Sequence, residues 1–172
     1  QTEKSVSALV LYLATVRAGG VYLPLNTAYT LNELEYFISD AEPALVVCDP
    51  AKLEGIKAIA AKVGAKVETL DPTGKGSLTE AADKAPKDFA TVPRENNDLA
   101  AILYTSGTTG RPKGAELTHR SLDINQEVSA RTLMAITSDD VIMGCLPLFH
   151  VFGLTCALLA SVTTGASLAL IP

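Results

Sequence analysis

Eleven consecutive residues near the middle of the chain combine hydroxyls, glycines and one lysine. They run from Tyr104 to Gly114 and read Tyr-Thr-Ser-Gly-Thr-Thr-Gly-Arg-Pro-Lys-Gly, directly after an apolar stretch. Glycines let the backbone approach a ligand, amide N–H groups in such a turn attract anions, and hydroxyls donate further hydrogen bonds. Lys113 adds a positive charge. The segment therefore suits a polyphosphate ligand, although a surface hairpin without a ligand has a similar composition.

Two common phosphate-binding patterns do not fit this segment. A Walker A loop requires Gly-Lys followed by Ser or Thr, whereas Lys113 lies between Pro112 and Gly114. The dinucleotide pattern Gly-x-Gly-x-x-Gly does not fit either. The eleven-residue string is more specific than its composition and has to be interpreted on its own.

Charge and composition narrow the class of ligand. The chain has 172 residues, a net charge of -5 and 48% hydrophobic residues, which is typical of a globular protein. An acidic chain is a poor surface for nucleic acid, so we expect no nucleic-acid partner. Positive charge gathers locally, which favours a small anion or a solvated turn; these residues are Arg111, Lys113, His119 and Arg120.

The cysteines and the most apolar segment bear on location. Cys48, Cys145 and Cys156 are odd in number and lie in apolar runs, so we expect reduced core residues of a cytoplasmic protein. Residues 151–162 are too few to cross a bilayer and are predicted to form a buried helix. The two histidines are isolated, which does not indicate a zinc site, and the metal ligands stay unknown.

Helices and strands alternate along the first part of the chain. Thr30 and Glu33 form a predicted capping box, and Gly64 follows a helical pattern that it could end. The predicted helices cover about residues 5–17 and 53–63, with another between them that carries Leu31, Leu34 and Ile38, and the predicted strands cover residues 21–25, 44–48 and 66–70.

The second part repeats the alternation after a polar segment. We expect three regions: a βα-repeat subdomain at 1–70, a polar connection at 71–98, and a loop-bearing βα subdomain at 99–172. The connection contains a second predicted capping box, Ser77 with Glu80. Predicted strands cover 99–104, 115–117, 141–144 and 167–171, and helices cover 119–135 and 151–162. The pattern predicts an α/β fold, a layered, largely parallel sheet with flanking helices.

The eleven-residue string resembles the AMP-binding signature of acyl-CoA synthetases, luciferases and peptide-synthetase adenylation domains. A second match is Leu-Pro-Leu-Phe-His-Val-Phe-Gly at residues 146–153, and a third is Gly-Val-Tyr-Leu-Pro-Leu-Asn at residues 20–26. Three signatures in family order cover most of the chain. The chain therefore resembles part of the large N-terminal domain of an adenylate-forming enzyme, an acyl-CoA synthetase.

The resemblance implies an ATP-dependent acid-thiol ligase. Members of the superfamily let a carboxylate attack the α-phosphate of Mg-ATP, release pyrophosphate, and pass the acyl group from the adenylate to a thiol. The implied ligands are ATP, Mg²⁺, coenzyme A and a small-molecule carboxylic acid, such as a long-chain fatty acid. Bringing two anions together requires preorganised donors and positive charge.

The resemblance also assigns roles to individual residues. Lys113 would offset charge on the β- and γ-phosphates, and His150 would contact the carboxylate or the α-phosphate as a catalytic group. Phe149, Phe152 and Gly153 are weaker candidates for the border of the acyl pocket. The predicted phosphate-binding residues are Thr105, Ser106, Gly107, Thr108, Thr109, Gly110 and Lys113.

Several alternatives remain open from the sequence. The family's segments for adenine, ribose and the mobile C-terminal domain are not matched, so we expect the isolated chain to be inactive in adenylation. Residues 22–43 look most like malonyl-CoA synthetases, whereas residues 146–154 look more like fatty-acid ligases. A carrier-loading adenylation domain and a non-catalytic nucleotide-binding module are the other readings.

Overall fold

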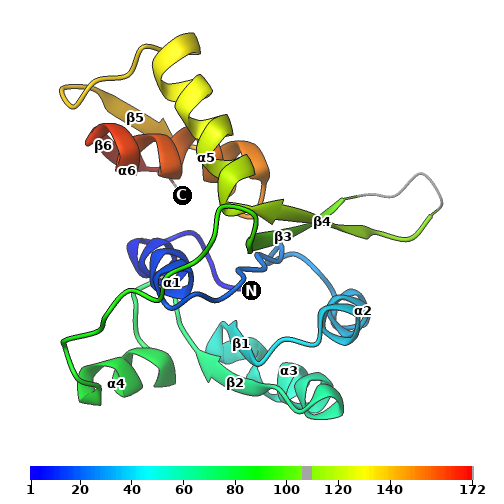
Figure 1. Ribbon diagram of the computed structural model, residues 1–172. Coiled ribbons are helices and arrows are strands. Elements are labelled where there is room, and N and C mark those ends of the chain that lie inside the picture. Colours follow the sequence, from blue (N-terminus) through cyan, green and yellow to red (C-terminus); the bar gives the residue numbers. More distant parts are fainter. Residues whose placement is uncertain (106–109, 172) are drawn as a thin grey trace. The chain divides into compact units, whose positions relative to one another are not determined.

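The computed structural model describes residues 1–105 and 110–171 and divides into two compact units (Figure 1). Unit 1 contains Gln1–Ala8 and Leu25–Phe89, and unit 2 contains Leu9–Pro24 and Ala90–Pro172. Helix α1 (Val6–Arg17) begins in unit 1 and continues in unit 2. Because the predicted loop and His150 both fall in unit 2, that unit carries the candidate site.

Unit 1 is built around a βαβ arrangement. Strand β1 pairs with β2 in parallel, with Leu45 opposite Lys66 and Cys48 opposite Thr69, and α3 connects the two strands. Parallel strands need such a crossover. The elements are α2 (Leu31–Ala41), β1 (Leu45–Cys48), η1 (Pro50–Lys52), α3 (Leu53–Ala60), η2 (Ala61–Val63), β2 (Lys66–Thr69) and α4 (Ser77–Lys84).

The start of α2 confirms the predicted capping box. The Thr30 amide donates to Glu33 Oε2 at 2.8 Å, and the Glu33 amide donates to Thr30 Oγ1 at 3.4 Å. The Thr30 amide also holds the pKa of Glu33 below its usual range. The helix buries Leu34, Phe37 and Ile38 on one face. Two orphan N–H groups at the helix end are satisfied in this way, and the buried face directs the helix onto the core.

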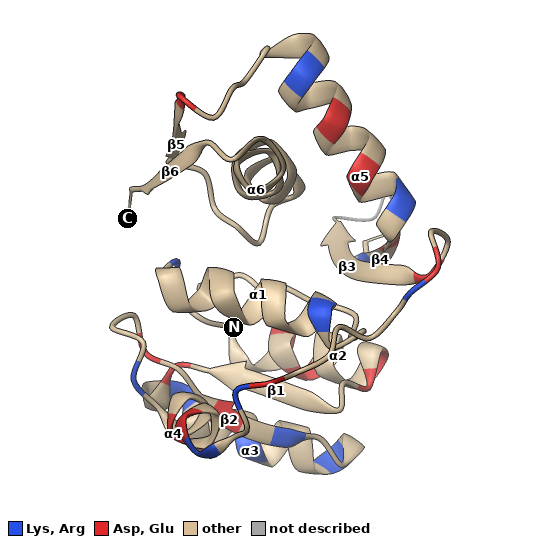
Figure 2. Cartoon of the chain, turned by 60° about the vertical axis from the view of Figure 1, so that its left-hand side comes forward, with Lys and Arg blue, Asp and Glu red and all other residues tan. Residues whose placement is uncertain are grey.

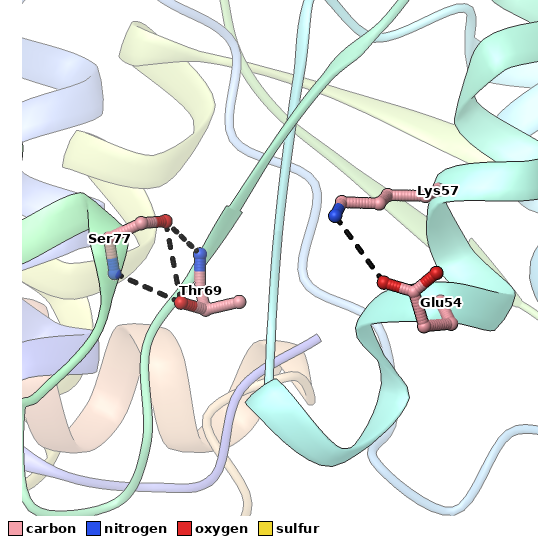
Figure 3. A network of polar contacts seen from close by, with 4 residues as sticks. All are labelled: Glu54, Lys57, Thr69 and Ser77. Atoms are coloured by element: carbon pink, nitrogen blue, oxygen red, sulfur yellow. Dashed lines mark hydrogen bonds and ion pairs between the residues drawn. The ribbon is translucent and has the colours of Figure 1, made fainter.

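The second predicted capping box is wrong, although the predicted helix α4 is present. Gly76 is the N-cap residue and no side chain caps the helix. The Ser77 hydroxyl instead accepts a hydrogen bond from the Thr69 amide at 2.9 Å, and the Ser77 amide donates to Thr69 Oγ1 at 2.9 Å (Figure 3). Ser77 also donates to Glu68 Oε2. The serine therefore ties α4 to the end of β2, because its hydroxyl accepts from a strand amide instead of from an amide of the helix start.

Replacement of Ser77 by Ala tests this link. Ala removes the acceptor of the Thr69 amide in a buried residue, so the free energy of unfolding is expected to fall by about 1–3 kcal/mol. Urea denaturation measures the change. The control is Glu54→Gln, which breaks only the exposed pair with Lys57 at 3.4 Å and should change stability by less than about 1 kcal/mol (Figure 3). Equal effects of the two substitutions would contradict the assigned role of Ser77.

Unit 2 contains one antiparallel and one parallel strand pair. β3 pairs with β4, and β5 pairs in parallel with β6 after the connection through η4 and α6. The elements are β3 (Leu99–Thr105), β4 (Lys113–Thr118), α5 (His119–Glu127), η3 (Val128–Leu133), β5 (Val141–Gly144), η4 (Gly153–Leu159), α6 (Ala160–Thr164) and β6 (Ser167–Leu170).

The α/β class is confirmed, with one local difference. Two strand pairs are parallel as predicted, but β3 and β4 are antiparallel because the connection of residues 106–112 is too short for a parallel crossover. The predicted strand at 21–25 reduces to a parallel bridge between Tyr22 and Ala101. Its Tyr22 amide donates to Ala100 O and its carbonyl accepts from the Ile102 amide, both at 2.9 Å.

Two predicted α-helices continue in π-helical form. The α-helical part of the helix predicted at 119–135 ends at Glu127, followed by π-helix η3, and Ala135 has a positive φ of 51°. The apolar segment contains π-helix η4 before α6. Hydrophobic spacing does not distinguish a π-turn from an α-turn, and π-turns are often found at functional sites.

Two apolar clusters form the core of unit 2. One joins β3 to α5 through Ala100, Ala101, Leu103 and Leu122. The other contains Tyr12, Leu154 and Leu158, with Tyr22 and Leu148 packed against it. Burial raises the pKa of Tyr12 and of Tyr22 to about 12, so both phenols stay neutral near neutral pH. These clusters connect the two segments that carry the predicted site residues.

The cysteines depart in one respect from the prediction. Cys48 is buried and Cys156 is partly buried, but Cys145 is exposed, because it follows the end of β5 rather than lying inside a helix or strand. Within the described residues the cysteines form no disulfide. In the same part of the chain, every helix is too short or too polar to cross a membrane.

Candidate functional site

The predicted phosphate loop lies between two paired strands. β3 ends at Thr105, β4 begins at Lys113, and the two residues are opposite each other in the antiparallel register. Thr105 Oγ1 donates to the Lys113 carbonyl at 3.4 Å. The strand pairing therefore brings together the first predicted hydroxyl and the predicted cation, which are eight positions apart in sequence.

Both paired residues are exposed. The burial pattern along β3 changes from buried at Ala100 to exposed at Thr105, and Lys113 is exposed at the start of β4. An exposed cationic residue and an exposed hydroxyl residue can reach an anion without a large desolvation cost. The strand ends thus set one cationic residue opposite one hydroxyl residue at the base of the loop.

Within the loop, the structure describes the residues from Gly110 onward. Gly110 has φ of +87° and is exposed, and a Cβ at this position would meet no atom of the described residues within 4 Å. Glycine is needed there for conformation rather than for space. Four predicted phosphate-binding residues lie outside the described residues: Ser106, Gly107, Thr108 and Thr109. Arg111 is also exposed.

Gly114 is the last residue of the eleven-residue string, and the sequence alone assigned it no role. It pairs with Tyr104, and a Cβ at Gly114 would lie 2.9 Å from Ile102 Cγ2 and 3.6 Å from Tyr104 Cζ. The missing side chain lets two β3 side chains pack across β4 directly beside Lys113. A glycine inside a strand is a signal for such close approach, so this role was detectable in principle.

His150 lies in a turn before η4 rather than in the loop. The His150 amide donates to the Pro147 carbonyl at 3.2 Å, and the Phe152 amide donates to His150 Nδ1 at 3.3 Å. Because Nδ1 accepts this hydrogen bond, a neutral imidazole carries its hydrogen on Nε2. The side chain is exposed. His150 can therefore offer an N–H donor to an anionic group.

The weaker acyl-pocket candidates have different surroundings. Phe152 is 55% exposed, Phe149 is partly buried, and Gly153 is buried. The structure thus pairs Thr105 with Lys113 and places His150, Phe149 and Phe152 on a separate turn. Leu148 of that turn packs on the cluster that also contains Tyr22, the residue bridged to β3.

The helix after the loop presents a mixed charged surface. Figure 2 shows a basic residue toward each end of the helix formed by α5 and its continuation, with acidic residues between them, and Arg131 Nε lies 2.8 Å from Glu127 Oε1. Across residues 1–105 and 110–171, no three His, Cys, Asp or Glu side chains group together as a metal site would require. Lys113 is the cationic residue that the strand register sets opposite Thr105.

Comparison with known proteins identifies the family. The AMP-binding enzyme family matches residues 1–172, the full length of the chain. The chain belongs to the AMP-binding enzyme family. The α/β fold and the recognised signatures agree with this membership.

Solved and curated members of the AMP-binding enzymes show how much of such a protein is covered. ATP-bound MatB from Rhodopseudomonas palustris is 60% identical, with a TM-score of 0.94, over 100% of this chain and 34% of that chain. Malonate–CoA ligase ACSF3 from Bos taurus is 37% identical over 99% of this chain and 28% of its own length. Probable CoA ligase CCL9 from Humulus lupulus is 32% identical over 96% of this chain and 32% of its own length. The chain therefore spans about a third of the length of these relatives.

A valine at position 114 tests the packing beside the loop. The added branches would collide with Ile102 and Tyr104 and push β4 away from β3, so Gly114→Val is expected to lower the free energy of unfolding by about 1–3 kcal/mol. Urea denaturation measures this change. The matched control Glu116→Val introduces the same side chain at an exposed β4 position and should stay within about 0.5 kcal/mol. Wild-type stability of Gly114→Val would contradict the packing role.

Proposed function

We propose that the full-length protein carrying this chain is an AMP-forming carboxylate–CoA ligase and that this chain supplies its phosphate-binding loop. The observation that carries the proposal is the register pairing of Thr105 with Lys113, which brings a hydroxyl and an ammonium to the base of the glycine-rich loop. Membership of the AMP-binding enzymes and the likeness to ATP-bound MatB support ATP as the nucleotide.

In the first half-reaction, a carboxylate oxygen attacks the α-phosphorus of ATP. The bond from that phosphorus to the bridging oxygen breaks, so pyrophosphate leaves and an acyl-adenylate forms. Negative charge accumulates on the departing pyrophosphate. Lys113 would offset this charge, and Thr105 with the loop residues 106–110 would donate hydrogen bonds to the phosphates.

His150 is proposed to act on the carboxylate side of the same step. Its Nε2–H would donate to the attacking carboxylate or to an α-phosphate oxygen, which lowers the repulsion between the two anions. In the second half-reaction, the sulfur of coenzyme A attacks the acyl carbonyl, its proton is released, and AMP leaves. Phe149 and Phe152 would border the acyl group.

Malonate is the acid that the comparisons favour for the full-length protein. The ACSF3 relative is a malonate–CoA ligase and is 37% identical to this chain over 99% of the chain. Long-chain fatty acids remain the competing substrate class that the 146–154 segment suggested. MgATP would be the form of the nucleotide bound, and the described residues contain no carboxylate cluster to which we would assign Mg²⁺. A cytoplasmic location also remains a prediction.

Replacement of Lys113 by Ala tests the role of the loop. Loss of the ammonium should slow adenylation by the full-length protein roughly 100-fold, because a preorganised charge at the leaving group is removed. Exchange of labelled pyrophosphate into ATP measures this step. Arg111→Ala is the matched control, since it removes an exposed cation from the same loop and should change the rate less than about threefold.

Two outcomes would contradict the assignment of Lys113. One is unchanged exchange in Lys113→Ala with unchanged thermal stability. The other is an equal loss in Arg111→Ala, which would indicate that only the general positive charge of the loop matters. Either result would leave the fold intact and remove the proposed phosphate contact.

A substrate panel tests the acid. AMP release by the full-length protein should be fastest with malonate and coenzyme A, and at least about tenfold slower with a long-chain fatty acid, since a second carboxylate and an alkyl chain require opposite pocket chemistry. Omitting coenzyme A should stop net turnover while pyrophosphate exchange continues. A faster rate with the fatty acid would overturn the malonate assignment and leave the ligase assignment in place.

A further inference from the structure

The turn that carries His150 folds back onto the start of the following helix. The Pro147 carbonyl accepts from the His150 amide at 3.2 Å, and the His150 carbonyl accepts from the Leu154 amide at 3.1 Å. Residues 151–152 are α-helical and continue into η4, and the second bond is the first i to i+4 bond of this continuous helix, so His150 occupies its N-cap position. The turn and the helix start are therefore one hydrogen-bonded unit.

The imidazole of His150 serves as the cap of this helix. Its Nδ1 accepts from the amide of Phe152, the second residue after the cap, at 3.3 Å. Side chains of Ser, Asn or Asp usually satisfy this otherwise unpaired amide. The contact fixes one ring nitrogen as the acceptor, so the other, Nε2, carries the hydrogen. A cap and a ligand donor are thus combined in one side chain.

Gly153 controls how closely the turn approaches the helix. A Cβ at Gly153 would lie 2.4 Å from the Pro147 carbonyl oxygen and 3.1 Å from its carbon, which are backbone atoms of the turn. Gly153 does not have a positive φ, so conformation does not require glycine here. Glycine in a helix costs about 1 kcal/mol relative to Ala. The reason for glycine is the space that the Pro147 carbonyl occupies.

We propose that Gly153 is a positioning residue that, together with the Phe152 amide, holds the His150 imidazole as an Nε2–H donor toward the reacting groups. A methyl group at position 153 would displace the Pro147 carbonyl, which accepts a hydrogen bond from the His150 amide. The His150 ring would then lose its alignment with the Phe152 amide. This inference rests on the proposed function, because it assigns to His150 a donor role in adenylation.

The first test is Gly153→Ala in the full-length protein. Pyrophosphate exchange at saturating ATP is expected to fall roughly tenfold or more, with little change in the KM for ATP, because the phosphate loop is untouched. The matched control Gly55→Ala adds a methyl group in α3, where the Cβ meets only the flexible end of Leu31, and should keep the wild-type rate. The ¹⁵N shifts of the His150 ring, assigned by comparison with His150→Asn, should change from the Nε2–H form to a tautomer mixture in Gly153→Ala only.

A second pair of variants addresses the amide itself and keeps the test decisive if Gly153→Ala does not fold. Phe152 has φ of -65°, which proline adopts, and it lies in the first helical turn, where proline is tolerated. Phe152→Pro removes the N–H donor together with the ring, whereas Phe152→Ala removes the ring alone. The rate of pyrophosphate exchange should fall further in Phe152→Pro than in Phe152→Ala. The ¹⁵N signature of the Nε2–H form of His150 should also weaken more in the proline variant.

The outcomes separate this inference from the proposed function. If the wild-type protein does not exchange pyrophosphate, the proposed function fails. If the wild type is active and Gly153→Ala keeps its rate, or Phe152→Pro and Phe152→Ala behave alike, the positioning role is overturned. A loss of rate with an unchanged His150 ¹⁵N signature would also overturn it, since the effect would then be structural only.

Discussion

The antiparallel ladder between β3 and β4 is the constraint on which the candidate site depends. Its register sets Thr105 against Lys113 and Tyr104 against Gly114, so the two ends of the loop are held at a strand-pair distance. The β3 side is anchored by Ala100 and Ala101 in the apolar core and by the bridge to Tyr22. A glycine-rich loop can keep a defined geometry only when such a rigid base restricts its ends.

The sequence was informative where local rules dominate. The Thr30 and Glu33 cap, the end of the α3 region at Gly64 and strand β5 were all predictable, because capping pairs, positive-φ glycines and apolar periods act over a few residues. The predicted capping box at Ser77 is wrong for the opposite reason. Its pattern with Glu80 is a local cap signal, but a strand residue distant from the helix, Thr69, competes successfully for its hydrogen bonds.

The chemistry of the site was easier to predict than its geometry. Residue types alone favoured a polyphosphate ligand beside the alternative of a surface hairpin, and the resemblance implied acid–thiol ligase chemistry but left the acid open. The antiparallel register and the π-helical turns did not follow from composition, since both depend on tertiary pairing and on backbone hydrogen bonds. Gly114 and Gly153 were visible as letters in the signatures, but their function becomes clear only from the atoms a Cβ would meet.

Both glycines act in the same way at the two separate parts of the site. At Gly114, missing side-chain volume admits Ile102 and Tyr104 beside the cation, and at Gly153 it admits a backbone carbonyl beside the histidine turn. Close packing against the backbone at these two glycines restricts its movement. Lys113 and His150 are therefore held in place without the ordering of additional side chains. The position of an exposed lysine or histidine is better defined when the backbone that carries it is closely packed. The signatures are therefore specific in their glycines as much as in their charged residues, because the charges act only where the backbone beneath them fits.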